Sequence, residues 1–147
     1  MRAVVQRVAS ASVAVEGREV GKIGRGLLVL AGFRKGDGED ALAWMARKIA
    51  SLRVFEGDGG RMNVPLDAVG GKVLVVSQFT LYGDVKKGAR PSFDQSASPE
   101  EARALYARFL DAMRAALPGR VETGEFQASM QVALVNDGPV TLIIDRD

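Results

Sequence analysis

The stretch Val132–Asp145 constrains the fold more than any other part of the chain. It reads VALVNDGPVTLIID, so two runs rich in β-branched residues flank Asn136–Pro139. Such runs predict strands, and Asn-Asp-Gly predicts a turn between them. A two-residue hairpin turn would be complete at Asp-Gly and has no need of a proline, which fixes φ and removes a backbone donor. We therefore expect a stiff corner at Gly138-Pro139, which is either an ordinary hairpin turn or a functional element.

The remaining sequence predicts further strands and two helices. Residues 3–15 alternate in strand fashion before a turn at Gly17, and residues 26–33 form a continuous apolar run that predicts a central strand. A long glycine-rich loop, of a kind that is often functional, is expected between residues 53 and 72. Ser98, Pro99 and Glu101 predict the start of the second helix. The apolar stripes are Leu42, Met45, Ile49 and Leu52 in the first helix and Leu105, Phe109, Met113 and Leu117 in the second.

These elements predict one mixed α/β domain over residues 1–147, with a mostly antiparallel or barrel-like sheet and two main helices. The chain has 0 Cys and 0 His, which excludes thiol nucleophiles, His-based triads and Cys/His zinc sites. We expect no metal and no cofactor. The formal charge of +2 neither requires nor excludes nucleic acid. Because Arg2, Gln6 and Arg7 interrupt the first apolar residues, no signal peptide or membrane span is expected, and a cytoplasmic protein is predicted.

A second unusual stretch is Ser77-Gln78-Phe79-Thr80, which interrupts an apolar run. Buried polar groups in a core strand need hydrogen-bond partners. Taken alone, the pattern favours a strand that enters solvent, and its functional reading depends on the rest of the sequence.

Together the two motifs resemble those of the D-aminoacyl-tRNA deacylases, in the branch that carries Ser-Gln-x-Thr and Asn-x-Gly-Pro-x-Thr. The second motif is here Asn136-Asp137-Gly138-Pro139-Val140-Thr141. The resemblance continues in order through MRAVVQRV, RMNV, SQFTLYGD, KGARPSF and MQVALVNDGPVT. One departure lies at Phe126-Gln127-Ala128-Ser129-Met130, where relatives usually read Phe-Gly-Ala-x-Met. This departure leaves the shape of that loop open.

The resemblance implies a homodimer that hydrolyses the ester between a D-amino acid, or glycine, and the 3′-terminal adenosine of tRNA. It implies that backbone amides of Phe79 and Thr80 serve the reacting carbonyl, while Ser77 and Gln78 shape the pocket. A cis Gly138-Pro139 from one subunit would enter the partner's site and exclude L-aminoacyl groups. The ribose hydroxyl beside the ester would help to activate water, so no strong base from the protein would then be needed.

The resemblance assigns further residues to substrate binding and chirality, namely Asn136, Thr141, Met130 and Arg7. Arg7 would brace the Gly-Pro motif, although a solvated charge on a strand is the alternative. A cationic loop that contains Lys86, Lys87 and Arg90 either meets tRNA phosphates or is simply solvated. Two rival functions stay open: a non-catalytic tRNA-binding module, and an esterase with the Thr80 hydroxyl as nucleophile.

Overall fold

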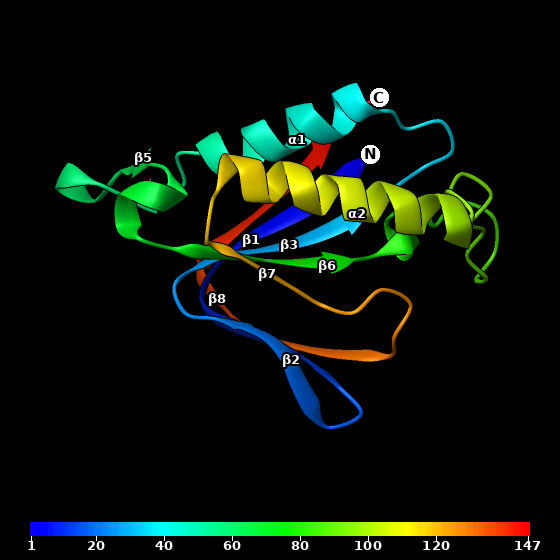
Figure 1. Cartoon of the computed structure of the whole chain (residues 1–147), viewed down its shortest axis with the longest axis horizontal. Coiled ribbons are helices and arrows are strands. Elements are labelled where there is room, and N and C mark those ends of the chain that lie inside the picture. Colours follow the sequence, from blue (N-terminus) through cyan, green and yellow to red (C-terminus); the bar gives the residue numbers. More distant parts are fainter.

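The computed structural model describes all 147 residues as a curved mixed sheet with two helices against one face (Figure 1). The main sheet has the strand order β2-β1-β3-β6-β7, and β8 pairs with β1. A separate two-stranded sheet joins β4 to β5. The elements are β1 (Arg2–Val15), β2 (Arg18–Ile23), β3 (Gly26–Gly32), α1 (Glu39–Ser51), β4 (Phe55–Glu56), β5 (Met62–Val64), β6 (Lys72–Ser77), α2 (Pro99–Ala116), β7 (Val121–Thr123) and β8 (Met130–Asp145).

The long strand β1 organises the sheet because it changes partners along its length. It pairs antiparallel with β3 through its first half and with β2 through its second half, while β8 follows it on the other side. The pairings β3–β6 and β6–β7 are parallel. The sheet curls until β2 approaches β7, and a Cβ built on Gly21 would lie 2.6 Å from the Thr123 carbonyl oxygen. The predicted mixed α/β, barrel-like fold is confirmed.

The helices cover one face of this sheet and complete the larger core, a cluster of 24 buried residues. The predicted apolar stripes of both helices face that core, with Leu52 half-buried and the others buried. Ser98 caps α2 as expected, since its side chain accepts a hydrogen bond from the Glu101 N–H over 3.2 Å. A smaller apolar cluster of 7 residues fills the concave side of the curl. Neither helix is long and apolar enough to cross a membrane.

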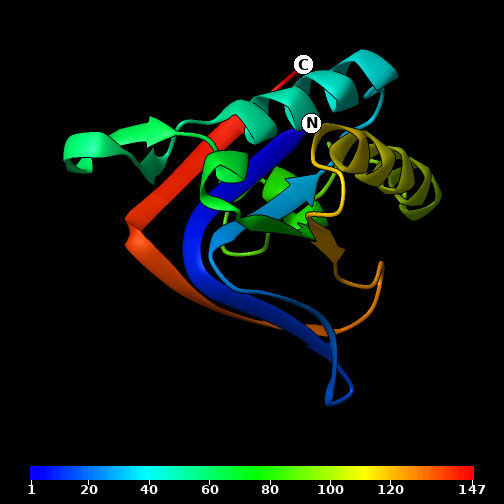
Figure 2. The same ribbon diagram turned by 60° about the vertical axis from the view of Figure 1, so that its left-hand side comes forward.

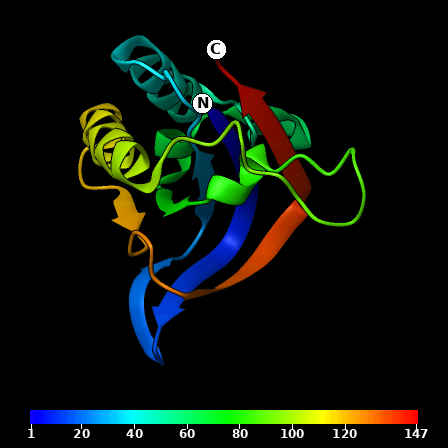
Figure 3. The ribbon, with the colours of Figure 1, turned by 90° about the vertical axis from the view of Figure 1, so that its right-hand side faces the viewer.

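The alternative of a hairpin turn at Asn136–Pro139 is wrong. Residues 130–145 form one strand, which pairs with β1 on both sides of the motif (Figures 2 and 3). Gln6 pairs with Thr141, and Val8 pairs with Asn136. Between these two pairs the chain advances by two residues along β1 but by five along β8, so three extra residues of β8 bulge outward. Because β1 is long enough to pair with both runs, the chain continues in one direction and does not reverse. The motif is therefore a bulge with three extra residues inside a strand.

The predicted loop between residues 53 and 72 is also more ordered than expected. It contains β4, β5 and the short 3-10 helices Asp58–Gly60 and Leu66–Val69. Gly59 and Gly60 have φ values of 77° and 73°, which allow the tight connection between the two strands. The many glycines thus indicate a compact hairpin that projects from the body.

Candidate active site

A cleft of about 920 Å³ opens where β6 ends, between the first turn of α2 and the start of β8. Its wall holds four of the residues predicted from the sequence, together with residues of α2 and of the loop before β8. Side chains that line it include Ser77, Gln78, Phe79, Ala102, Phe126 and Met130. The structure therefore gathers most of the first motif and Met130 around one cavity.

The Ser-Gln-Phe-Thr motif marks the point where β6 ends and a 3-10 helix, Phe79–Tyr82, begins. β6 is buried through Val76, and the Phe79 side chain is 58% exposed. The first N–H groups of such a helix have no acceptor inside it. Neither Phe79 nor Thr80 donates its N–H to a side chain or to a loop carbonyl. The turn thus presents two backbone donors beside the cleft.

Thr80 lies beside the cleft, and its hydroxyl is not set up as a nucleophile. The Gln78 side-chain amide donates a hydrogen bond to the Thr80 hydroxyl oxygen. An amide cannot accept the hydroxyl proton through its nitrogen, so this contact orients Thr80 without activating it.

The tyrosines near the site do not supply a base. Burial raises the pKa of Tyr106 to about 12, and its hydroxyl donates to the Val75 carbonyl over 3.0 Å. Burial, followed by the charge of Asp37, raises the pKa of Tyr82 to about 12 as well. No three carboxylate side chains converge on one point, so the structure offers no metal-binding cluster. The groups that the site offers for catalysis are therefore mainly hydrogen-bond donors.

The second motif lies on β8, away from this cleft. The Gly138–Pro139 peptide bond is cis, as the resemblance implies. Asn136 Nδ2 donates to the carbonyls of Arg7 and Val140, each over 3.0 Å, and so closes the base of the bulge. Thr141 Oγ1 accepts a hydrogen bond from Gln6 Nε2 over 3.2 Å. Gly138 and Pro139 are both exposed at the tip.

Arg7 supports this bulge from below, and the alternative of a solvated strand charge is wrong. It is 6% exposed and is the one charged residue among the buried set. Its Nε donates to the Asp137 carbonyl over 3.1 Å, and its Nη1 donates to the Val54 carbonyl over 2.7 Å. A Cβ on Gly138 would lie 2.6 Å from Arg7 Nη2, so the backbone approaches the guanidinium closely. A buried charge with such partners fixes the bulge against the body.

Comparison with known proteins agrees with the family that the sequence resembles. The family model described as D-Tyr-tRNA(Tyr) deacylase matches residues 4–145. The chain is 58% identical over 146 residues to a D-aminoacyl-tRNA deacylase of Pelobacter propionicus, covering 99% of this chain and 100% of that one. It is 59% identical over 147 residues to one of Desulfitobacterium hafniense, covering 100% and 98%.

The chain belongs to the D-aminoacyl-tRNA deacylase family. Two solved structures share its fold. One, described as a c-Myc DNA unwinding element binding protein, is 42% identical, with a TM-score of 0.95, and the match covers 100% of this chain and 99% of that one. The other, a probable eukaryotic D-amino acid tRNA deacylase, is 21% identical, with a TM-score of 0.85 over 99% and 98%, and shows the fold alone.

In this deacylase-family chain the two motifs do not meet. The cleft is lined by Met130 and Val132 of β8 but by no residue of the bulge. Asn136, at the base of the bulge, is six positions after Met130, and a strand rises about 3.3 Å per residue, so the bulge begins about 20 Å farther along the strand. A single chain therefore cannot place its Gly-Pro corner in its own cleft.

The loop that departs from the family pattern keeps a backbone shape that glycine would favour. Gln127 has φ 61° and is one of two non-glycine residues with positive φ. Its side-chain oxygen accepts a hydrogen bond from Arg103 Nη2 over 2.7 Å. The sequence pattern identified this position, but the contact with Arg103 has no local signal because 24 residues separate the two.

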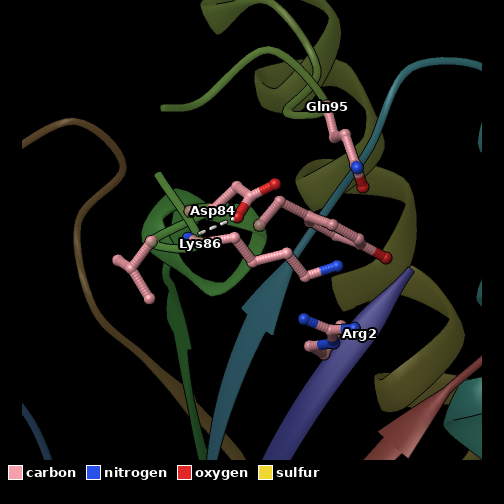
Figure 4. Close-up of a pocket in the computed structure, with 7 residues that line it drawn as sticks. Arg2, Asp84, Lys86 and Gln95 are labelled. Carbon is pink, nitrogen blue, oxygen red and sulfur yellow. Dashed lines mark hydrogen bonds between the residues drawn. The ribbon is translucent and has the colours of Figure 1, made fainter. Parts of the chain in front are cut away.

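A second, smaller pocket of about 270 Å³ lies beyond the 3-10 helix (Figure 4). Arg2, Lys86, Asp84 and Gln95 contribute to its wall, and the Arg2 guanidinium lies over the Tyr82 ring. A hydrogen bond from Arg2 to Asp145 raises the arginine pKa, and the Lys86 N–H donates to Asp84. The ion pair between Arg2 and Asp145 suits a structural role for this arginine.

Proposed function

We propose that this protein hydrolyses the ester between a D-amino acid and the 3′-terminal adenosine of tRNA. The observation that carries the proposal is the cleft with exposed backbone donors at Phe79 and Thr80, in a chain of this family. An aminoacyl ester is already reactive, so positioning and stabilisation of the oxyanion supply much of the required catalysis. The N–H groups at the start of the 3-10 helix are suitably placed donors for that oxyanion.

The chirality of the substrate would be tested by the partner subunit in a homodimer. Gly138 and Pro139 are exposed at the tip of a bulge that is rigidly supported but remote from its own cleft. Inserted into a partner's cleft, the backbone of this corner would contact the α-amino group and leave no space for an L side chain. Glycine has no side chain to exclude, so glycyl-tRNA would also be a substrate.

The apolar surface of β8 supports the dimer. This strand pairs on one side only, and it carries Val135 and Ile143 with exposed fractions of 57% and 70%. Exposed apolar residues on an edge strand favour association with another chain. The same strand carries the Gly-Pro corner, so one contact would both cover this surface and deliver the filter.

Deacylation of three substrates tests the proposed function. We expect the purified protein to release the amino acid from D-tyrosyl-tRNA and glycyl-tRNA, and to leave L-tyrosyl-tRNA intact. Binding to all three without release would instead identify a non-catalytic tRNA-binding module. Cleavage of simple esters that lack a vicinal hydroxyl would support the threonine esterase.

Substitution of Thr80 separates backbone from side-chain catalysis. Thr80→Ala is expected to retain at least about a tenth of kcat, because it removes a side chain worth roughly one hydrogen bond and keeps the backbone N–H. Single-turnover deacylation of D-tyrosyl-tRNA measures this, with Thr80→Ser as the matched variant. Loss of more than about a thousandfold in Thr80→Ala, with recovery in Thr80→Ser, would make the hydroxyl the nucleophile.

A further inference from the structure

Arg103 and Gln127 form a polar pair at the edge of the cleft. Arg103 Nη2 donates to Gln127 Oε1 over 2.7 Å, and the guanidinium lies over the Phe126 ring, 4.7 Å from its centroid. Phe126 is stacked in turn on Tyr106, with 5.7 Å between ring centroids and an interplanar angle of 27°. The guanidinium is thus held by a ring on one side and an amide oxygen on another.

Arg103 has no carboxylate partner, although it is oriented. None of the ion pairs in the structure includes it, whereas the other arginines of α2, Arg108 and Arg114, pair with Glu39 and Asp111. Its side chain is exposed, so its remaining N–H donors are available to a ligand. A guanidinium in a fixed orientation, with unused donors and no counter-ion, is suited to bind an anion such as a phosphate.

In this arrangement the backbone of Gln127 adopts an energetically unfavourable conformation. Its φ of 61° lies in the left-handed region, which is unfavourable for a residue with a Cβ. The other such residue, Glu16, lies in the two-residue turn between β1 and β2, where both positions have positive φ. Glycine at position 127 would relieve the strain but would remove the amide that orients Arg103.

The cleft itself lacks a cation, since none of its 17 lining residues is charged. Phe126 and Gln127 line it, and Ala102, the residue before Arg103, does so as well. Arg103 therefore lies next to the lining. A terminal nucleoside held in the cleft has a single phosphodiester that connects it to the rest of the RNA. The RNA backbone must pass over the edge of the cleft, so this phosphate must lie at that edge.

We propose that Arg103, oriented by Gln127, binds the phosphate on the 5′ side of the terminal adenosine of tRNA. This inference rests on the proposed function, because it takes the 3′ end of tRNA as the ligand of the cleft. Arg103 is then a binding residue for the substrate backbone, and Gln127 is a positioning residue that acts through it.

Substrates with and without the phosphate test this role. Arg103→Ala is expected to raise KM for D-tyrosyl-tRNA roughly ten- to a hundredfold, with kcat changed by less than about twofold. KM for D-tyrosyl-adenosine, which has no phosphate, should be unchanged. The slope of log KM against log salt concentration should fall by about one for tRNA. Arg114→Ala is the matched control, because it removes the same charge about 16 Å along the same helix.

The Gln127→Gly variant is expected to weaken the binding of tRNA without lowering the thermal stability of the protein. It is expected to raise KM for tRNA by about three- to tenfold, since one oriented hydrogen bond is lost. Its thermal unfolding midpoint should equal or exceed that of the wild type, because the left-handed strain is removed. A merely structural role for Gln127 would not raise KM in a variant of undiminished stability.

Equal effects of Arg103→Ala on both substrates, or no effect on either, would overturn the proposal. Binding of an uncharged acceptor-stem RNA that ends in CCA, measured by fluorescence anisotropy, distinguishes this failure from failure of the proposed function. If the wild type hydrolyses neither substrate, the hydrolytic function is wrong. Weaker binding of this RNA by Arg103→Ala would still support the phosphate contact, and equal binding would exclude it.

Discussion

A D-aminoacyl-tRNA whose terminal adenosine lacks the 2′-hydroxyl, with the amino acid on the 3′ oxygen, is expected to be hydrolysed more than a hundredfold more slowly than the normal substrate. Loss of one hydrogen bond would reduce the rate only about ten- to a hundredfold. A larger loss is expected because the cleft is lined by uncharged residues and burial raises the pKa of Tyr106 to about 12. The substrate hydroxyl must then take part in activating water or in stabilising the transition state.

Single-turnover rates with saturating enzyme measure this chemical step. Competition with uncharged tRNA shows whether the deoxy substrate still binds. The spontaneous hydrolysis of both esters must be measured in parallel, because the vicinal hydroxyl also affects the reactivity of the free ester. An undiminished rate with the deoxy substrate would exclude this mechanism and favour the rival in which the Thr80 hydroxyl is the nucleophile.

Val135→Glu is expected to convert the protein to a monomer and to reduce deacylation by at least about a hundredfold. Val135 is 57% exposed, so in an isolated chain this substitution should change stability by no more than about 0.5 kcal/mol. In a symmetric dimer the variant would instead bury a carboxylate twice, at a cost of several kcal/mol. Light scattering and the deacylation assay on one sample measure both effects.

The matched control is Ala115→Glu, which adds the same charge at an exposed position near the end of α2, remote from Arg103. It should leave both the molar mass and the activity unchanged. A fully active wild-type monomer, or a Val135→Glu monomer with full activity, would contradict delivery of the Gly-Pro corner by a partner subunit.

The helices and the strand segments were predictable because their signals are local. The α2 start depends on Ser98, Pro99 and Glu101, which lie within four residues, and the apolar stripes follow the helical period. The continuity of β8 was not predictable in this way. Asn-Asp-Gly-Pro has the composition of a turn, and only the length of β1, far away in the sequence, decides that the strand continues.

The residues of the candidate site also differ in whether a local signal in the sequence could reveal them. The Ser-Gln-Phe-Thr residues stand out because polar side chains interrupt an apolar strand, but only the resemblance to the family assigns them to a site. The partners of Arg7 are the carbonyls of Asp137 and Val54, and every residue carries a carbonyl, so no sequence pattern marks them. The pairing of Arg103 with Gln127 likewise depends on how α2 crosses the sheet.

Because of the bulge in β8, the length of this segment is more tightly constrained than the identity of its residues. Paired strand lies on both sides of the bulge, so Asn136–Thr141 functions as a spacer of set length between two registers. One residue inserted in or deleted from either paired run would slide part of that run along β1, and a slip of one residue turns every side chain there to the opposite face. A residue gained or lost within the bulge would leave the registers unchanged but would move the Gly-Pro corner. For the fold of a single chain, substitutions at exposed positions of β8 are thus more easily accommodated than a change in its length. Insertions and deletions in this segment should be rare among proteins that keep this architecture.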